Sequence, residues 1–427
     1  MSFFNRIKQL YTSEFFKFSA VLLSSNAIAQ IIGFFVYPII TRLYNPEIFG
    51  LFNFFLSIVS VLTLSSTGRY ELAIVLCKSE KKAVALFQLS LLLTVGVSLF
   101  FLIIVSLFGK NISALFHHEQ MTSLLPYLPV YLLLWGFWQT QNYYFVRQKR
   151  YYNLSIYNVT QSVISSGMKC FFGFKGFLTF GLIWGQLLGQ FLATSVSAIS
   201  GRASFKHLKQ WDKHEIVSVA KIYANFPKYE LPHGLLNSLA GNLPILLLAF
   251  YFEMGKIGFF SLALTIGLTP VTLFGSSVYQ VLFRKMSERV QNKENIMNDC
   301  LLFCKMCVII ILPFFVIFAF MPDGFFTLLF GVKWIGVGFY FKLLLPCLFL
   351  SVLVSSLCFI PDIFFKQKTA IQIEIIYLIL KVLSLLLGVY FQNFDLAVIS
   401  YCIVVTLMLI VKLIWYFRIV KNYELLK

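Results

Sequence analysis

The chain has 427 residues, of which 59% are hydrophobic and only 12% are charged, and its mean hydropathy is +0.83. A soluble domain of this length carries about a quarter charged residues, so the composition excludes a soluble globular protein and leaves no soluble domain of useful size. Lys and Arg number 35 against 17 Asp and Glu, which gives a formal net charge of +18.

Residues 1–18 are basic and amphipathic, and we expect them to lie on the inner membrane surface. We do not expect them to form a signal peptide, because the apolar run that follows is too long and no small-residue cleavage site follows it. Residues 26–76 then contain two apolar runs, each longer than the roughly 20 residues that a helix needs to cross a bilayer. The chain is therefore predicted to enter the membrane within its first fifty residues.

Twelve such stretches follow one another, and they predict an all-α membrane protein with twelve transmembrane helices. The predicted spans are residues 18–40, 48–76, 84–108, 122–146, 153–173, 177–199, 230–252, 257–282, 300–321, 336–360, 369–391 and 395–417. The fifth and sixth are the weakest, because the segment that joins them is short and rich in glycine.

The first span carries a polar face. Asn26, Gln30, Gly33 and Tyr37 recur at helical spacing between apolar residues. This face is expected to look at protein or water rather than lipid. Its amides either join neighbouring helices or line a cavity, and the sequence favours neither role over the other.

Arg69 stands near the end of the second predicted span. If the helix continues to Leu76, Arg69 lies two turns inside the membrane, and Glu71 points to another side of the helix and cannot be its partner. If the helix ends at Gly68, Arg69 is an ordinary cation of an inner loop. The first alternative makes Arg69 a candidate for a functional side chain.

The fourth span ends with Trp135, Trp138, Gln139, Asn142 and Phe145 on one helical face. Aromatic rings beside amides suit stacking on sugars, but such rings more commonly form the belt at the membrane surface. Near the seventh span, Lys228 and Glu230 form a further charged cluster of lower weight.

Lys381 is the strongest single candidate for a functional side chain. It lies about twelve residues into its span, roughly 18 Å along the helix, where its amine cannot reach the headgroups. Glu374 shares its face. The structural alternative is a lysine that pairs with a neighbouring helix. Four other lysines are close enough to a helix end to reach the surface: Lys169, Lys305, Lys342 and Lys412.

No pattern indicates an enzyme, a metal or a cofactor. Cys300, Cys304 and Cys307 have the spacing of an iron–sulfur loop, but they open a continuous apolar helix that would splay their thiols, so we interpret them as small packing residues. His117 and His118 share an outer turn without a third ligand nearby. Catalytic triads, paired catalytic carboxylates and phosphate-binding glycine loops are also missing from the sequence.

The distribution of cations predicts the orientation. With a cytoplasmic N-terminus, the inner segments hold 24 Lys and Arg residues and the outer turns hold five. This asymmetry supports twelve spans with both termini in the cytoplasm. It also accounts for most of the positive charge, so no nucleic-acid partner is needed.

A faint internal repeat aligns Gly50 with Gly258 and pairs IFGLFNFFLSI with KIGFFSLALTI. Two copies of six helices would start on the same side of the membrane and be related by a pseudo-two-fold axis along the membrane normal. The predicted organisation is an N-terminal lobe of residues 1–200, a cytoplasmic linker of residues 201–221 and a C-terminal lobe of residues 222–427, with a site between the lobes.

The segment TRLYNPEIFGLFNFFLSIVS, followed by RYELAIVL, resembles the opening of the bacterial polysaccharide flippases. These proteins move O-antigen or capsule repeat units and belong to a superfamily with the multidrug antiporters and the peptidoglycan lipid flippases. The resemblance is sharpest over residues 14–90. It implies transport of an undecaprenyl-pyrophosphate-linked oligosaccharide across the bacterial inner membrane by alternating access, in a pathway that includes a polymerase and glycosyltransferases.

Similar proteins hold the anionic head in a cationic cavity, and the residues of this chain that could serve there are selected by their depth and charge, not by a family motif. The cations that could bind the head are Arg69, Lys228 and Lys381. Possible ion-coupling or charge-partner groups are Glu374 and Glu230. Possible contacts in the cavity or with the glycan are Asn26, Gln30, Trp138, Gln139 and Asn142.

Two other functions remain open. A drug-cation antiporter of the same superfamily would need an acidic residue deep in its N-terminal lobe, where the first six spans offer only Glu71, near a helix end. A polysaccharide polymerase would need a large outer loop, and the longest outer turn has only about a dozen residues, from Gly109 to Met121.

Overall fold

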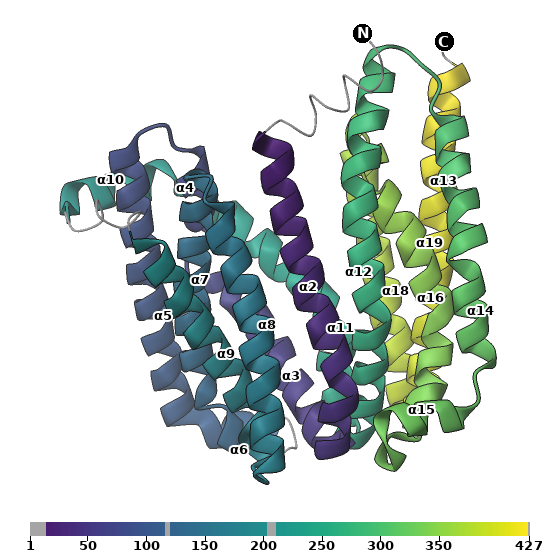
Figure 1. Ribbon diagram of the computed structural model, residues 1–427, viewed down its shortest axis with the longest axis horizontal. Coiled ribbons are helices and arrows are strands. Elements are labelled where there is room, and N and C mark those ends of the chain that lie inside the picture. The colour runs from purple at the N-terminus through teal and green to yellow at the C-terminus, as the bar shows by residue number, and fades with distance from the viewer. Residues whose placement is uncertain (1–13, 116–119, 203–210, 426–427) are drawn as a thin grey trace. The chain divides into compact units, whose positions relative to one another are not determined.

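The computed structural model describes residues 14–115, 120–202 and 211–425, and all regular elements in these ranges are helical (Figure 1). Most of the expected amphipathic start (residues 1–13), the pair His117 and His118, and linker residues 203–210 lie outside them. The chain forms two compact units, which are described separately. Unit 1 comprises the described parts of residues 1–44 and 51–246, and unit 2 those of residues 45–50 and 247–427.

Unit 1 is a bundle in which α8 packs along both α2 and α9, and α5 packs along α7. Its elements are α2 (Glu14–Leu43), most of α3 (Pro46–Leu62), a 3₁₀ turn (Thr63–Ser65), α4 (Glu71–Leu76), α5 (Glu80–Leu115), α6 (Met121–Leu124), α7 (Tyr127–Arg147), α8 (Tyr151–Phe174), α9 (Leu178–Ser200), α10 (Lys213–Ile222), a π-helical turn (Phe226–Glu230) and most of α11 (Leu231–Tyr251).

Unit 2 is a second bundle, in which α12 packs on α16, and α19 packs on both α16 and α18. Its elements are α12 (Met254–Gln291), α13 (Met297–Ile310), α14 (Leu312–Phe320), α15 (Asp323–Phe330), a 3₁₀ turn (Val332–Trp334), α16 (Val337–Leu357), α17 (Ile360–Ile363), α18 (Gln367–Tyr390) and α19 (Phe394–Leu425). The two units divide the chain at positions other than the predicted lobe boundaries, which stay a prediction defined by the sequence repeat.

The all-helical membrane fold is confirmed for the described residues, where ten helices are long and apolar enough to cross a membrane. The fourth and fifth predicted spans coincide with α7 and α8, which do not meet that criterion. For α8 the polar residues account for the difference, because Asn153, Ser162 and Ser165 lower its hydropathy and are buried instead of facing lipid. Twelve spans, two symmetric lobes and cytoplasmic termini therefore stay predictions.

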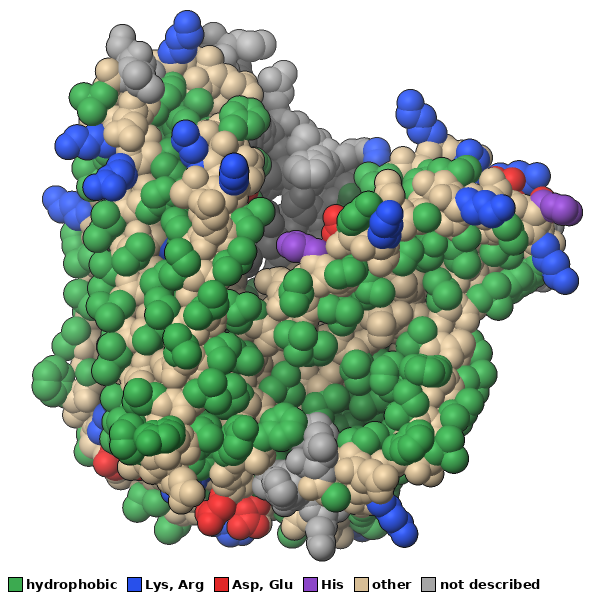
Figure 2. Space-filling model, turned by 180° about the vertical axis from the view of Figure 1, so that it is seen from behind, with side chains coloured by type: hydrophobic (Ala, Val, Ile, Leu, Met, Phe, Trp, Pro, Cys, Tyr) green, Lys and Arg blue, Asp and Glu red, His purple; other side chains and the backbone are tan. Residues whose placement is uncertain are grey.

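The surface of each unit fits a membrane environment. On the face drawn in Figure 2, hydrophobic side chains cover the long sides of the helices, and Lys and Arg side chains gather mainly at helix ends. Many large apolar side chains are exposed, among them Phe35, Leu107 and Leu328. Such an exposed apolar surface would be costly in water and is favourable in lipid.

The start of α3 and the start of α12 cross at very close range within unit 2. A Cβ atom on Gly50 would lie less than 3.0 Å from the carbonyl oxygen of Met254, and one on Gly258 would lie less than 3.0 Å from that of Pro46. The contact is reciprocal, because Pro46 precedes Gly50 by the same interval as Met254 precedes Gly258. This local two-fold relation is what the sequence repeat predicts for these two glycines.

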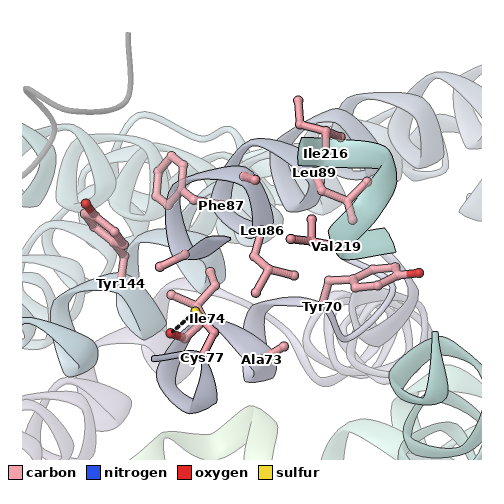
Figure 3. Packing of buried hydrophobic residues seen from close by; sticks show 12 residues of the cluster. Tyr70, Ala73, Ile74, Cys77, Leu86, Phe87, Leu89, Tyr144, Ile216 and Val219 are labelled. Carbon is pink, nitrogen blue, oxygen red and sulfur yellow. Dashed lines mark hydrogen bonds between the residues drawn. The ribbon is translucent and has the colours of Figure 1, made fainter. Parts of the chain in front are cut away.

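A hydrophobic cluster joins the short helix α4 to α5, α7 and α10 in unit 1 (Figure 3). Ile74 of α4 and Leu86 of α5 are fully buried in it, together with Val219 of α10. The hydroxyl of Tyr70 donates a hydrogen bond to the carbonyl oxygen of Ala220 at 3.0 Å. The cluster therefore fixes the position of the segment that follows Arg69.

The residue that precedes α10, Asp212, caps the start of this helix. The Asp212 carboxylate accepts hydrogen bonds from the backbone N–H groups of His214 (3.1 Å) and Glu215 (3.3 Å), and it lies 3.6 Å from the amine of Lys81. The N–H of Glu215, followed by the charge of Lys81, holds the pKa of Asp212 below its usual value. The ionised form is thus the one that stabilises the start of α10.

Acid should therefore loosen α10 before the membrane helices. Because the folded-state pKa is depressed, the stabilisation is present above the unfolded value of about 4 and is lost as the pH falls through the folded value. We expect amide hydrogen exchange in residues 213–222 to increase in acid, and the Asp212→Ala variant to show the faster exchange already at pH 7. Equal exchange in the variant and the parent at pH 7 would contradict this role of the cap.

Candidate functional site

The second predicted span is not one continuous helix. The helix α3 ends at Leu62, a 3₁₀ turn follows, and α4 starts only at Glu71. Gly68 (φ +60°) and Arg69 (φ +64°) are both in the left-handed region, which stops an α-helix. Hydroxyl side chains before the break compete with the helical hydrogen bonds. Each donates to a backbone carbonyl oxygen three or four residues earlier: Ser57, Ser60, Thr63, Ser65 and Ser66.

The break changes the surroundings of Arg69. Its side chain is 19% exposed, and its Nη1 lies 3.7 Å from Oε1 of Glu71. The expectation that Glu71 could not be its partner is therefore wrong, because the two residues do not share one regular helix. Arg69 is neither deep in a continuous helix nor in an open loop: it is a largely buried cation at an interruption between two helices.

The donors of Arg69 are only partly used. Its Nε is buried and has no hydrogen-bond partner among the described residues. Glu71, 2% exposed, already accepts a hydrogen bond from the Thr67 hydroxyl at 2.5 Å. On α11, Gly234 leaves room for the guanidinium, since a Cβ atom there would lie 3.4 Å from Nη2. Arg69 can therefore donate a hydrogen bond from Nε to an incoming anion without breaking an existing hydrogen bond of that group.

Lys228 and Glu230 lie in the π-helical turn that precedes α11, and both are exposed. The amine of Lys228 lies 5.1 Å from the ring centroid of its neighbour Tyr229. Within the described chain, Lys228 and Glu230 do not form an ion pair with each other. Neither residue forms a hydrogen bond or an ion pair with Arg69 among the described residues, so their roles stay a prediction.

Lys381 lies inside α18 between two aromatic rings of unit 2. Its amine is 4.5 Å from the ring centroid of Tyr377 and 6.0 Å from that of Tyr401 on α19, distances at which a cation is attracted to a ring face. In the part of unit 2 that the structure describes, no carboxylate lies within 4.0 Å of it. The sequence reasoning missed Tyr377, although its position four residues before Lys381 on the same helix indicates the contact.

Glu374 does not neutralise Lys381 directly. It accepts a hydrogen bond from Lys412 at 2.6 Å, and the amine of Lys412 also lies 4.5 Å from the ring of Tyr377. The expectation that Lys412 reaches the headgroups is wrong, because α19 continues to Leu425 and the side chain is 9% exposed. The amines of Lys381 and Lys412 thus both lie near the ring of Tyr377, and because Glu374 pairs with Lys412, one positive charge remains on Lys381.

Lys169 also differs from the expectation of a lysine that reaches the surface. It donates to Oε1 of Gln186 at 2.7 Å and lies 5.1 Å from the ring centroid of Phe52. Lys342 does lie at the start of its helix, where it pairs with Asp323 at 2.8 Å. Lys305 is exposed. For Lys305 and Lys342, the expectation that the amine reaches the headgroups stays a prediction.

The polar face of α2 is hydrogen-bonded to α8 at Asn26. Its side-chain oxygen accepts a hydrogen bond from Nδ2 of Asn158 on α8 at 2.7 Å, and the Ser162 hydroxyl donates to the carbonyl oxygen of Ala29 at 2.6 Å. Asn26 nevertheless stays exposed, and Gln30 is half-buried. The helix-joining role is therefore present at Asn26, and a contact with a ligand stays a proposal for both amides.

Trp138 is part of the core of unit 1. Its ring is 5% exposed and stacks on Tyr157, whose hydroxyl donates to Oε1 of Gln190 at 2.6 Å. The expected places of this ring, in a surface belt or against a sugar, are both wrong, because both require an accessible face. Gln139 and Asn142 are half-buried and hydrogen-bonded to each other at 3.3 Å, so they keep a possible polar role.

The cysteines do not form a metal site in the described chain. Cys300 and Cys307 are buried, Cys304 is half-buried, and all three thiols are free. No group of three or more His, Cys, Asp or Glu side chains in the described ranges could hold a metal ion. The two candidate binding sites that remain in the described chain are therefore cationic. They are Arg69 in unit 1 and Lys381 in unit 2.

Comparisons with known proteins show the family and the fold of the chain. A family model described as a polysaccharide biosynthesis protein matches residues 39–338. The teichuronic acid biosynthesis protein TuaB of Bacillus subtilis (strain 168) is 24% identical over 262 residues, which are 60% of this chain and 52% of that protein. The chain thus spans about half the length of this relative.

Two solved structures share the fold. The lipid II flippase MurJ in an inward closed conformation matches with a TM-score of 0.68 and 16% identity, over 96% of this chain and 90% of that one. An inward-facing multidrug resistance MATE family transporter of the MOP superfamily matches with a TM-score of 0.58 and 12% identity, over 94% and 95% of the two chains. At these identities the likeness concerns the fold alone.

Proposed function

The chain belongs to the polysaccharide biosynthesis protein family, and from this premise we propose that it is a flippase for lipid-linked oligosaccharides. It would take an undecaprenyl-pyrophosphate-linked repeat unit from the cytoplasmic leaflet of the bacterial inner membrane and release it in the outer leaflet. The product would be an O-antigen, a capsule or another surface polysaccharide. The protein would act as a transporter without chemistry of its own, beside the polymerase and glycosyltransferases of its pathway.

The observation that carries this proposal is the state of two embedded cations. Arg69 is largely buried with an unpartnered Nε, and Lys381 contacts aromatic rings with no carboxylate within 4.0 Å in the described residues. Cations inside membrane segments are costly and usually mark the path of a substrate or an ion. An anionic substrate would supply the missing partners.

The chemistry of a pyrophosphate head fits such groups. Its oxygens lose their hydration on entering the membrane, a cost that only hydrogen bonds or opposite charges can offset. Guanidinium and ammonium groups form the strongest such bonds with phosphate oxygens. Arg69 and Lys381 would each bind the pyrophosphate head during transport. Lys228 is exposed in a π-helical turn and would bind the head before it reaches the buried cations.

The glycan contacts would come from amides. Asn26, Gln30, Gln139 and Asn142 are exposed or half-buried on their helices and can bind sugar hydroxyls. Trp138 is not included, because its ring is buried in the core.

Membrane potential favours the proposed direction. Moving negative charge out of a cell that is negative inside is favourable by about 2.3 kcal/mol per charge per 100 mV. An ion cycle through Glu374 or Glu230 would add to this term. For Glu374, the ion would have to compete with Lys412, which already donates to it at 2.6 Å.

A drug-cation antiporter is the second candidate, favoured by the MATE fold and by the buried Glu71. That carboxylate, however, already accepts from Thr67 and lies 3.7 Å from Arg69. A cationic drug would have to displace an internal cation, whereas an anion would join it. The flippase is therefore the better match to the charge at this position.

Lipid-linked repeat units in a deletion strain test the proposal. We expect them to accumulate on the cytoplasmic leaflet, and restoring the intact chain should clear them. Units that reach the outer face without the protein and stay unpolymerised would point to a polymerase. Increased sensitivity to cationic drugs with normal export would point to the antiporter.

A further inference from the structure

An open hollow of about 770 Å³ lies in unit 1, where α4 ends, α5 begins, α7 ends and α8 begins. Its polar lining comes from Cys77, Lys78, Glu80, Arg147, Gln148 and Lys149. The volume falls in the range of roughly 300–1,000 Å³ that is typical of small-molecule pockets. None of these residues belongs to the proposed transport site, so the hollow needs its own explanation.

Arg147 forms a fixed wall of this hollow. Its guanidinium donates to the backbone carbonyl oxygens of Ile74 (3.1 Å), Cys77 and Lys78 (3.5 Å). These carbonyls end α4 and its following turn, where helical partners are missing. Its Nε also pairs with Glu80 Oε2 at 3.1 Å. The charge of Arg147 is thus balanced by Glu80 and its donors are occupied.

Lys78 and Lys149 are the remaining charges of the lining. Both are exposed, and neither forms an ion pair with any residue that the structure describes. With Arg147 and Glu80 paired, the two amines give the hollow a net charge of about +2. A ligand that matches this lining carries negative charge and several acceptor oxygens, as a phosphate does.

The backbone at Lys149 gives a second indication. Lys149 has φ +58°, the left-handed conformation that ends helices and favours glycine or asparagine. Its N–H donates to the carbonyl oxygen of Val146 and that of Arg150 donates to Phe145, which closes the end of α7. A lysine in this conformation has backbone strain that glycine would not have. Strain of this kind is found mainly at functional positions.

The position of the hollow points to a lipid. Its lining also includes Val75 and Val146, and the neighbouring Leu76 and Tyr152 expose apolar surface. The turns of residues 77–79 and 148–150 are predicted to face the cytoplasm, where anionic lipids attract basic residues. A charged hollow beside apolar surface suits a headgroup with attached acyl chains better than a water-soluble anion.

We propose that this hollow binds the phosphate of an anionic membrane phospholipid from the cytoplasmic leaflet. The amines of Lys78 and Lys149 donate to the phosphate oxygens, Arg147 holds the wall against which the headgroup rests, and the acyl chains leave past Val75 and Leu76. The bound lipid would fasten the α4–α5 turn to the α7–α8 turn. The inference concerns a lipid other than the transported one and stands whether or not the chain is a flippase.

Native mass spectrometry of the full-length protein in detergent tests this site, with phosphatidylglycerol as the probe. We expect the Lys78→Gln/Lys149→Gln variant to bind the first phosphatidylglycerol about tenfold more weakly than the parent, since two cations near a headgroup are removed. The matched control is Lys366→Gln/Lys368→Gln, which removes two exposed lysines of another predicted cytoplasmic turn. It should leave the affinity of the first lipid nearly unchanged.

A second variant separates lipid binding from folding. Lys149→Gly removes the amine but relieves the strain at φ +58°, so the lipid-free protein should melt no lower than the parent and still bind phosphatidylglycerol more weakly. Unchanged binding in both variants, or an equal loss in the Lys366 and Lys368 control, would overturn the proposal. So would displacement of phosphatidylglycerol by millimolar inorganic phosphate, which would make the site one for free phosphate.

Discussion

Export of lipid-linked repeat units should fall by about 10- to 150-fold when either Arg69 or Lys381 is replaced by alanine. Each variant removes a charge-assisted hydrogen bond to the pyrophosphate head, which is worth roughly 1.5–3 kcal/mol, and each 1.4 kcal/mol is a factor of ten. The measurement is the amount of repeat unit that reaches the outer leaflet in a deletion strain carrying the variant at matched protein levels.

The matched control is Lys305→Ala, which removes an exposed cation from another helix of unit 2. It should export normally. Lys381→Arg should retain part of the activity because it keeps the charge beside Tyr377 and Tyr401, although the planar guanidinium will not reproduce the ammonium contacts. Normal export in Lys381→Ala would remove Lys381 from the site, and normal export in Arg69→Ala would do the same for Arg69.

The second large effect is on folding, at the crossing of α3 and α12. Replacing Gly258 with alanine should destabilise the protein by at least about 3 kcal/mol, because the new methyl group would collide with the backbone carbonyl of Pro46. A backbone atom cannot move aside as a flexible side chain can. Gly258→Val should yield little folded protein. Gly50→Ala should behave like Gly258→Ala, since its methyl group would meet the carbonyl of Met254.

Thermal melting and the size of the monodisperse peak in detergent measure this effect. The control is Gly241→Ala on α11, where no atom lies within 4 Å of the added Cβ and where alanine favours the helix. It should melt at the same temperature as the parent or higher. A Gly258→Ala protein as stable as Gly241→Ala would show that the two helices can separate at the crossing without cost.

The helices themselves could be read from the sequence because each needs a long apolar run. Each predicted span falls mainly on helical segments of the described chain, since a backbone in lipid must satisfy its own hydrogen bonds, although the second span is divided between α3 and α4. The ends of the helices were harder to predict from the sequence than their positions. Hydropathy placed the end of the last span near residue 417, whereas α19 continues to Leu425, and this is why Lys412 was wrongly expected to reach the surface.

The break at Arg69 had a signal that hydropathy ignores. Four of the five residues from 63 to 67 carry a hydroxyl group and glycine follows at 68, a combination that competes with helical hydrogen bonds. Once the helix breaks, Arg69 and Glu71 can meet, which a regular helix forbids. Local turn chemistry, more than periodicity, therefore decided the surroundings of this candidate residue.

Contacts between distant helices were beyond the sequence. The stacking of Trp138 on Tyr157 and the ion pair of Lys412 with Glu374 join different helices, and only packing shows which faces meet. A tryptophan near a helix end looks the same in a surface belt and in a core. The depth of Lys381 along its helix predicted that it needs a partner or water, but not that its neighbours would be the rings of Tyr377 and Tyr401.

Flipping by the purified protein tests the central claim most directly. The full-length chain is reconstituted into liposomes with the polyprenyl-diphosphate-linked oligosaccharide that accumulates in the deletion strain, and the fraction of sugar open to an added membrane-impermeant glycosidase is followed over time. We predict that the parent protein exposes the inner pool of sugar, and that the Arg69→Ala and Lys381→Ala proteins leave it protected. If the parent protein leaves the inner pool as protected as in empty liposomes, the chain is not a flippase for this lipid.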